Sequence, residues 1–270
     1  TLSIIADGTL QLGQSTAFIP EAGDAIISDN LNTVGEQGGQ VTVLGNRVAL
    51  VDATIRAEGN TSGGQFYIGG NYQGNGPLPN ATQTIVNAGT VLNADALAQG
   101  NGGEIIVWAD NTTSFGGTAT ARGGHSKGDG GFIEISGKSN LEFTGGFDVS
   151  TLQGEFGTVL FDPDNIEIVD GTGIANGDTE LGNPVVGTVI AQDNDGGWFT
   201  IHEDTLETWD GNANIVLQAN NDIIVRNLGG DNTLSFQPGT GTIEFIADAD
   251  DYGVGQFLMD RAGDLIAAAG

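Results

Sequence analysis

Cysteine is absent from the 270-residue sequence, and this absence excludes several kinds of site. The chain cannot form a disulfide, a thiolate metal centre or a cysteine nucleophile. Packing and hydrogen bonds alone must therefore stabilise whatever fold it adopts. The lack of cysteine also fits a secreted bacterial protein, which crosses membranes as an unfolded chain.

Positively charged residues are also scarce. Seven Lys and Arg residues stand against 35 Asp and Glu residues, giving a formal net charge of −28 at pH 7. Such an acidic surface repels nucleic-acid phosphates, so nucleic acid is not expected as a partner. If turns stack so that Asp110, Asp162 and Asp164 lie close together, their like charges raise their folded-state pKa values. Folding is then favoured at mildly acidic pH.

Histidines and long apolar runs are few. His125 and His202 are the only histidines. Neither has a second histidine nearby, so a zinc site is not expected. No stretch approaches about 18 uninterrupted apolar residues, so the sequence predicts no transmembrane segment.

Glycine, in contrast, is abundant and leads a strand pattern that recurs through the first 160 residues. Five segments carry apolar residues two and four positions after a glycine. They start at Gly39, Gly64, Gly103, Gly131 and Gly157, with Val41, Phe66, Ile105, Ile133 and Val159 two positions later. This alternation predicts strands with one buried face. The spacings of 25, 39, 28 and 26 residues predict that the strands stack as coils of a solenoid. Glu134 falls between the apolar positions, so it is expected to face outward and to tolerate replacement by alanine.

Smaller residues mark a second set of strands, which end on Gly59, Gly100, Gly123 and Gly154. Counting back from these glycines predicts inward positions at Ala57, Ala98, Ala121 and Leu152 and at Ile55, Ala96, Ala119 and Ser150. Val51, Phe115 and Phe143 suggest a third inward position. Two or three strands per coil predict an all-β parallel β-helix of about ten coils. A sandwich is disfavoured because like strands repeat in one direction, and a propeller because its blades are longer.

The regularity of this pattern divides the chain in two. Residues 1–162 form regular coils, and residues 163–270 continue with less regular ones. The longest spacing contains an insertion of 39 − 25 = 14 residues. Its two prolines predict a loop that projects from the coil at residues 72–80. Residues 203–209, which begin with two acids, are the only plausible helix.

Gly-rich strings occur in a particular order: GGNYQG (69–74), GPLPNA (76–81), GNGG (100–103), VWAD (107–110), DPDNI (162–166) and ADADDYGVG (247–255). In this order the chain resembles the filamentous-haemagglutinin-like exoproteins of bacterial two-partner secretion, particularly the large cyanobacterial members. The resemblance implies a right-handed parallel β-helix that is secreted or displayed at the cell surface as an adhesin or stalk. It also implies export by an outer-membrane barrel transporter and binding to a surface glycan or protein receptor. The family's secretion domain, with its Asn-Pro-Asn-Gly type motifs, is missing from this stretch.

Enzymes are the main alternative, because parallel β-helices also serve as polysaccharide lyases and glycosidases. The seven basic residues are scattered: Arg47, Arg56, Arg122, Lys127, Lys138, Arg226 and Arg261. Close acid pairs such as Asp162/Asp164 arise by chance among 35 acids. We therefore expect no catalytic residues and no enzymatic activity. A self-associating matrix component is a further alternative.

Calcium is the one candidate cofactor, because carboxylates on turns suit a hard cation. The candidate ligands are Asp193, Asp195, Asp248, Asp250 and Asp251, with ordinary Asx turns as the alternative interpretation. Trp108 and Tyr72 are the candidate ligand-binding residues. Trp108 would serve as a sugar-stacking platform if it faces solvent, and as a packed strand aromatic otherwise.

Overall fold

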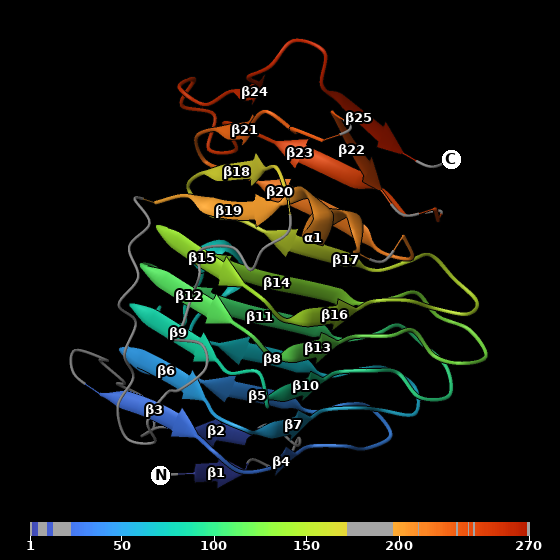
Figure 1. Cartoon of the computed structure of the whole chain (residues 1–270). Helices are drawn as coiled ribbons and strands as arrows, with labels where there is room; N and C mark the ends of the chain where they lie inside the picture. The colour runs from blue at the N-terminus through green and yellow to red at the C-terminus, as the bar shows by residue number, and fades with distance from the viewer. Residues whose placement is uncertain are drawn as a thin grey trace.

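The computed structural model describes residues 2–4, 10–12, 23–171, 197–209, 211–230, 232–236, 238–239 and 241–268. Its strands stack along one axis from the N-terminus to the C-terminus (Figure 1). Nearly all neighbouring strands are parallel, and the chain forms a right-handed parallel β-helix, which confirms the predicted fold class.

Sheet 1 runs the length of the stack. In spatial order it contains β1 (Leu2–Ile4), β2 (Leu10–Leu12), β5 (Gln40–Val43), β8 (Gln65–Ile68), β11 (Glu104–Ala109), β14 (Phe132–Gly137), β17 (Thr158–Phe161), β20 (Asn214–Gln218) and β23 (Ile243–Ile246). Only β1 is antiparallel to its neighbour. The register pairs Phe66 with Ile105, Ile105 with Ile133 and Ile133 with Val159, which confirms the predicted inward column.

Two shorter sheets complete each coil. Sheet 2 contains β3 (Asp24–Ile27), β6 (Arg47–Leu50), β9 (Gln83–Val86), β12 (Thr112–Phe115) and β15 (Asn140–Phe143). Sheet 3 contains β4 (Leu31–Asn32), β7 (Thr54–Arg56), β10 (Val91–Asn93), β13 (Thr118–Thr120) and β16 (Gly146–Asp148). The chain follows sheet 1, sheet 2 and sheet 3 in turn and returns through the loops at the right of Figure 1.

A steric constraint explains why glycine leads the strands of sheet 1. A Cβ atom on Gly103 would lie 2.0 Å from the carbonyl oxygen of Gly64, one coil below. A Cβ atom on Gly131 would lie 2.1 Å from the carbonyl oxygen of Gly103. Both distances are far below van der Waals contact, so the corner before each strand admits only glycine if the coils are to stack at strand spacing.

The C-terminal part of the stack departs from the order of sheet 1, sheet 2 and sheet 3. Sheet 4 contains β19 (Phe199–His202), β18 (Ile166–Val169), β21 (Ile223–Val225) and β24 (Phe257–Met259), and sheet 5 contains β22 (Thr233–Phe236) and β25 (Leu265–Ala268). Although β19 follows β18 in sequence, it lies between β15 and β18. The predicted helix is present as α1 (Glu203–Glu207), and Trp209 after it stacks on Phe161 at 5.0 Å between ring centroids. Strand β19 and helix α1 therefore form an extra layer on one side of the stack. In sheet 1, β17 pairs directly with β20.

Two predictions about inward positions need correction. The inward column of sheet 3 contains Ile55, Leu92, Ala119 and Phe147, so Ala98 and Leu152 are not inward and both are exposed. The turn before Gly100 is longer than the turn before Gly59, and counting back from the glycine therefore ends in the turn. In sheet 2 the inward residue is Leu50, and Val51 packs outside with Ala49 and Ile85. Sheet 1 has eight parallel strands within the described ranges, and the prediction of about ten coils for the whole chain stays a prediction.

Candidate functional site

The insertion predicted to project from the coil instead lies flat on the outer face of sheet 1. It begins with the short helix η1 (Tyr72–Gly74), which contacts β11. Gly74 has a φ of +63°, and a Cβ atom there would lie 2.5 Å from the Trp108 ring. The amide of Asn80 donates to the carbonyl oxygen of Gly74 and to Asp110, at 2.9 Å each. We call residues 71–80 the cover loop.

The cover loop changes the interpretation of both aromatic candidates. Trp108 faces outward from the sheet, as its position predicted, but it is only 4% exposed because the loop covers it. It is thus a packed strand aromatic and no stacking platform in this conformation. Tyr72 belongs to the loop and remains exposed, with its ring edge-on to Phe132 at 5.7 Å.

Two carboxyl groups lie buried beneath the cover loop. Glu134 is 0% exposed, and both of its carboxyl oxygens accept from the backbone N–H of Gln73, at 3.0 and 3.1 Å. Asp162 is 5% exposed and follows β17, and its own N–H donates to the hydroxyl of Ser136. The Oδ1 atom of Asp162 has no hydrogen-bond partner among the described residues.

Burial dominates the electrostatics of this pair. It raises the pKa of Glu134 to about 8; the hydrogen bond from the Gln73 N–H acts in the opposite direction but is outweighed, and the charge of Asp162 adds to the rise. Burial likewise raises the pKa of Asp162 to about 6, with the charge of Asp164 contributing. The predicted direction for Asp162 is confirmed, but desolvation outweighs the like-charge repulsion from which it was argued.

Glu134 faces outward from sheet 1, as its position predicted, but it is buried, because a face that points away from the core is not necessarily exposed to solvent. Its tolerance of alanine stays a prediction. Its neighbours in the same outward column are Ile106 below and Leu160 above, and both are buried. Apolar residues on both sides of an outward-facing acid are a sequence signal for a covered face. That signal could have identified the pair of Glu134 with Asp162.

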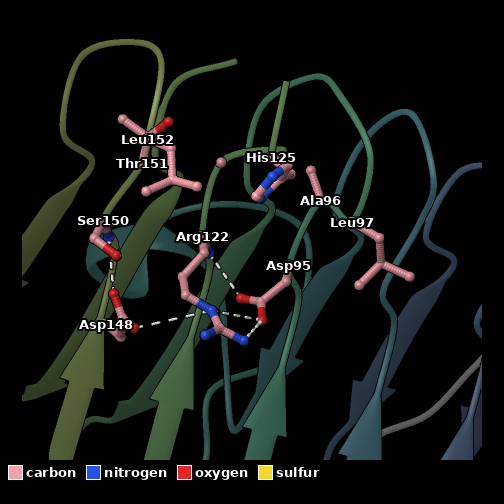
Figure 2. A pocket seen from close by; sticks show the side chains of 10 residues that line it. Asp95, Ala96, Leu97, Arg122, His125, Asp148, Ser150, Thr151 and Leu152 are labelled. Atoms are coloured by element: carbon pink, nitrogen blue, oxygen red, sulfur yellow. Dashed lines mark hydrogen bonds and ion pairs between the residues drawn. The ribbon is translucent and has the colours of Figure 1, made fainter. Parts of the chain in front are cut away.

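A groove opens where the loops leave sheet 3 (Figure 2). Asp95, buried at its floor, accepts three hydrogen bonds from Arg122: from the backbone N–H at 2.7 Å, from Nε at 2.9 Å and from Nη2 at 2.6 Å. Asp148 lies 3.8 Å from Arg122 Nε and accepts from the N–H of Ser150. One cation thus bridges acids from two neighbouring coils.

The walls of this groove mix polar and apolar groups. His125, Thr151, Leu97 and Leu152 line it, and its volume is about 310 Å³. Leu152 is 65% exposed and Leu97 also faces solvent. With a bridged arginine at the floor, hydroxyl groups along the side and exposed leucines at the rim, the groove suits a ligand with polar and apolar faces, such as a sugar or a peptide.

The calcium candidates divide into two groups. Asp193 and Asp195 lie outside the described residues. The carboxylate of Asp248 accepts from the N–H groups of Gly253 and Val254, and Asp250 accepts from the N–H of Tyr252. These are bonds within one turn, and they favour the Asx-turn interpretation. Among the described residues, no cluster of three or more His, Asp or Glu side chains could hold a metal ion. Calcium binding at Asp248, Asp250 and Asp251 stays a prediction.

Excess carboxylates lead to a prediction about salt. Within the described ranges, four arginines form ion pairs: Arg47 with Asp24, Arg56 with Glu58, Arg122 with Asp95 and Arg226 with Glu167. With 35 acids against seven basic residues, most carboxylates lack a cationic partner. We expect the melting temperature at pH 7 in low salt to rise with added salt, because screening weakens repulsion between stacked turns.

If the turns at Asp248, Asp250 and Asp251 bind calcium, millimolar CaCl₂ should raise the melting temperature more than NaCl at matched ionic strength, because a cation that binds only the folded chain stabilises it. Differential scanning calorimetry checks both salts. Equal rises in melting temperature with the two salts would mean that calcium acts only by screening. No rise with either salt would show that the carboxylates are too far apart to repel one another.

A scan against protein-family models gave no match to this chain, and a search of the curated proteins gave none. Neither of the two helices within the described ranges is long and apolar enough to cross a membrane.

Proposed function

We propose that this chain is a structural and adhesive segment of a secreted bacterial surface protein of the filamentous-haemagglutinin-like kind. The observation that carries the proposal is the continuity of sheet 1, in which the eight strands from β2 to β23 within the described ranges are parallel to one another. Each coil is hydrogen-bonded to the next and buries the same apolar column. Such a stack suits a stalk, because its length can grow coil by coil without a change in cross-section.

Export and display complete the proposal. The sequence resemblance supports passage through an outer-membrane barrel transporter, recognised through a domain outside this stretch. Antibodies raised against the purified segment should then label intact cells of the source bacterium. Label that appears only after permeabilisation would contradict surface display.

The groove around Arg122 is the part that we propose to contact a surface glycan or protein receptor. Its exposed leucines are the groups whose burial would stabilise a complex, since Asp95 and Arg122 already satisfy each other. Beads coated with the segment should adhere to receptor-bearing cells or to immobilised glycans. Replacing Leu152 with Asp should reduce adhesion by about tenfold or more, because a charge replaces the apolar contact.

Val254 provides a matched control, since it is 74% exposed, against 65% for Leu152, and does not line the groove. Val254→Asp adds the same charge and should leave adhesion unchanged. Equal losses in both variants would mean that added negative charge alone weakens adhesion, and no loss in Leu152→Asp would remove the groove from the proposal.

A polysaccharide-active enzyme remains the second candidate because one observation favours it. Glu134 and Asp162 are neighbouring carboxyl groups with separated pKa values, about 8 and about 6, and glycosidases divide the acid and base roles between such groups. However, both groups are buried beneath the cover loop, where a polymer cannot reach them. The scaffold proposal accounts for the buried pair as part of the loop's attachment.

A further inference from the structure

The cover loop is attached to sheet 1 through an acid. Gln73 and Gly74 both have left-handed φ values, +52° and +63°, and this turn directs the N–H of Gln73 at the two carboxyl oxygens of Glu134. A non-glycine residue adopts this conformation at a cost, so the turn persists only while its contacts hold it. The bond from the Gln73 N–H to Glu134 fixes the tip of the loop, together with a hydrogen bond between the Gln73 side chain and Asp162.

The closed loop keeps a large aromatic surface from water. Trp108 lies beneath Gly74, and its indole N–H donates to Asp110 at 3.0 Å. Asn80, at the far end of the loop, donates to the same Asp110 oxygen. Opening the loop would therefore break a small set of hydrogen bonds and expose the outward face of β11.

The charges around Glu134 all have the same sign. Asp162 above and Glu104 below act on Glu134, and Asp164 acts on Asp162. From the loop itself, the only titratable group near the pair is the phenol of Tyr72; burial, with both carboxylates adding to it, raises its pKa. Tyr67 on β8 donates its hydroxyl to Glu104. An ionised Glu134 would thus place a buried negative charge among other acids, stabilised by one N–H and the hydroxyl of Ser136.

We propose that the cover loop is a flap, held closed over sheet 1 while Glu134 carries its proton and released when Glu134 ionises. This goes beyond a stalk or adhesin role, because it makes the exposure of Trp108 and of the face around it depend on pH. The surface that the segment presents would differ between acidic and alkaline surroundings.

The direction of the pH dependence follows from linkage. In the closed state burial raises the pKa of Glu134 to about 8, whereas an open loop returns the carboxyl group to water and towards its ordinary value of 4.5. The closed state is fully favoured below that ordinary value, and the preference is lost as pH rises through about 8. The equilibrium constant for opening of the cover loop, called the opening constant below, should rise by up to about tenfold per pH unit within this window and then level off.

Hydrogen exchange of the Gln73 amide in the whole 270-residue chain tests the proposal. After correction for intrinsic exchange, the opening constant should rise about 100-fold or more between pH 5 and pH 8 and level off above pH 9. Glu134→Gln is the matched variant, because its amide oxygen still accepts from Gln73 but cannot ionise. In this variant only Asp162, with a closed-state pKa of about 6, still links opening to pH, so the opening constant of the loop should rise no more than about tenfold over the same range.

Acrylamide quenching of Trp108 fluorescence, taken as the difference from a Trp108→Phe variant, gives a second readout. It should increase with pH in the parent chain and stay low in Glu134→Gln. Gly74→Ala should expose Trp108 at every pH, because the added Cβ clashes with the ring. A parallel pH response in the parent chain and in Glu134→Gln, or no response in the parent chain, would overturn the proposal.

Discussion

Replacing Ile133 with alanine should lower the free energy of unfolding by about 2–5 kcal/mol. Ile133 is fully buried and lies between Ile105 of the coil below and Val159 of the coil above. Truncation leaves a cavity between two coils, and the hydrogen-bonded strands on either side cannot close it. Urea unfolding followed by circular dichroism measures the change.

Thr118, an exposed residue of β13, is the control for this prediction. Its replacement by alanine should change the free energy of unfolding by less than about 0.5 kcal/mol. If Ile133→Ala were as mild as Thr118→Ala, the inward column would not be the core of the stack.

The free energy of unfolding should be highest at mildly acidic pH and fall as pH rises, which is the opposite of the usual acid lability. Glu134 has a folded pKa of about 8 against an ordinary 4.5, so its contribution is complete below 4.5 and is lost as pH rises through about 8. The shift corresponds to a loss on the order of 5 kcal/mol across this window. Asp162, with a folded pKa of about 6, adds a smaller loss at lower pH.

Denaturant unfolding at a series of pH values measures this fall, and Glu134→Gln should remove most of it. Opening of the cover loop limits the loss in the free energy of unfolding, because an open loop lets Glu134 ionise in water while the coils stay folded. Stability that rises between pH 5 and pH 8 in the parent chain would contradict the burial of this carboxyl group.

The column of sheet 1 could be predicted from the sequence because glycine, apolar alternation and spacing all indicate the same register. Ile105, Ile133 and Val159 follow a glycine by two positions, and the glycine is fixed by the close approach of the coil below. The register of sheet 3 could not be predicted in the same way. Its turns vary in length, so Leu92 and not Ala98 faces inward.

The positions of inserted segments depend on contacts that no local pattern encodes. The cover loop has the prolines and amides of a projecting loop, yet it folds back because Gly74 fits against Trp108 and Gln73 bonds to Glu134, 61 residues away. The placement of β19 below β18 is a similar case, since either order has the same strand pattern in the sequence. The groove would have been predictable with a correct sheet 3 register, which brings Asp95, Arg122 and Asp148 onto neighbouring coils.

We propose that this segment acts by presenting a surface and not by turning over a substrate. The most direct test is to incubate the purified segment with a panel of bacterial and plant polysaccharides and to measure their chain length by size-exclusion chromatography. We expect every polymer to keep its length, including at the pH near 7 where Glu134 would be protonated and Asp162 ionised. Shortening of any polymer that is abolished by Glu134→Gln or by Asp162→Asn would contradict the claim.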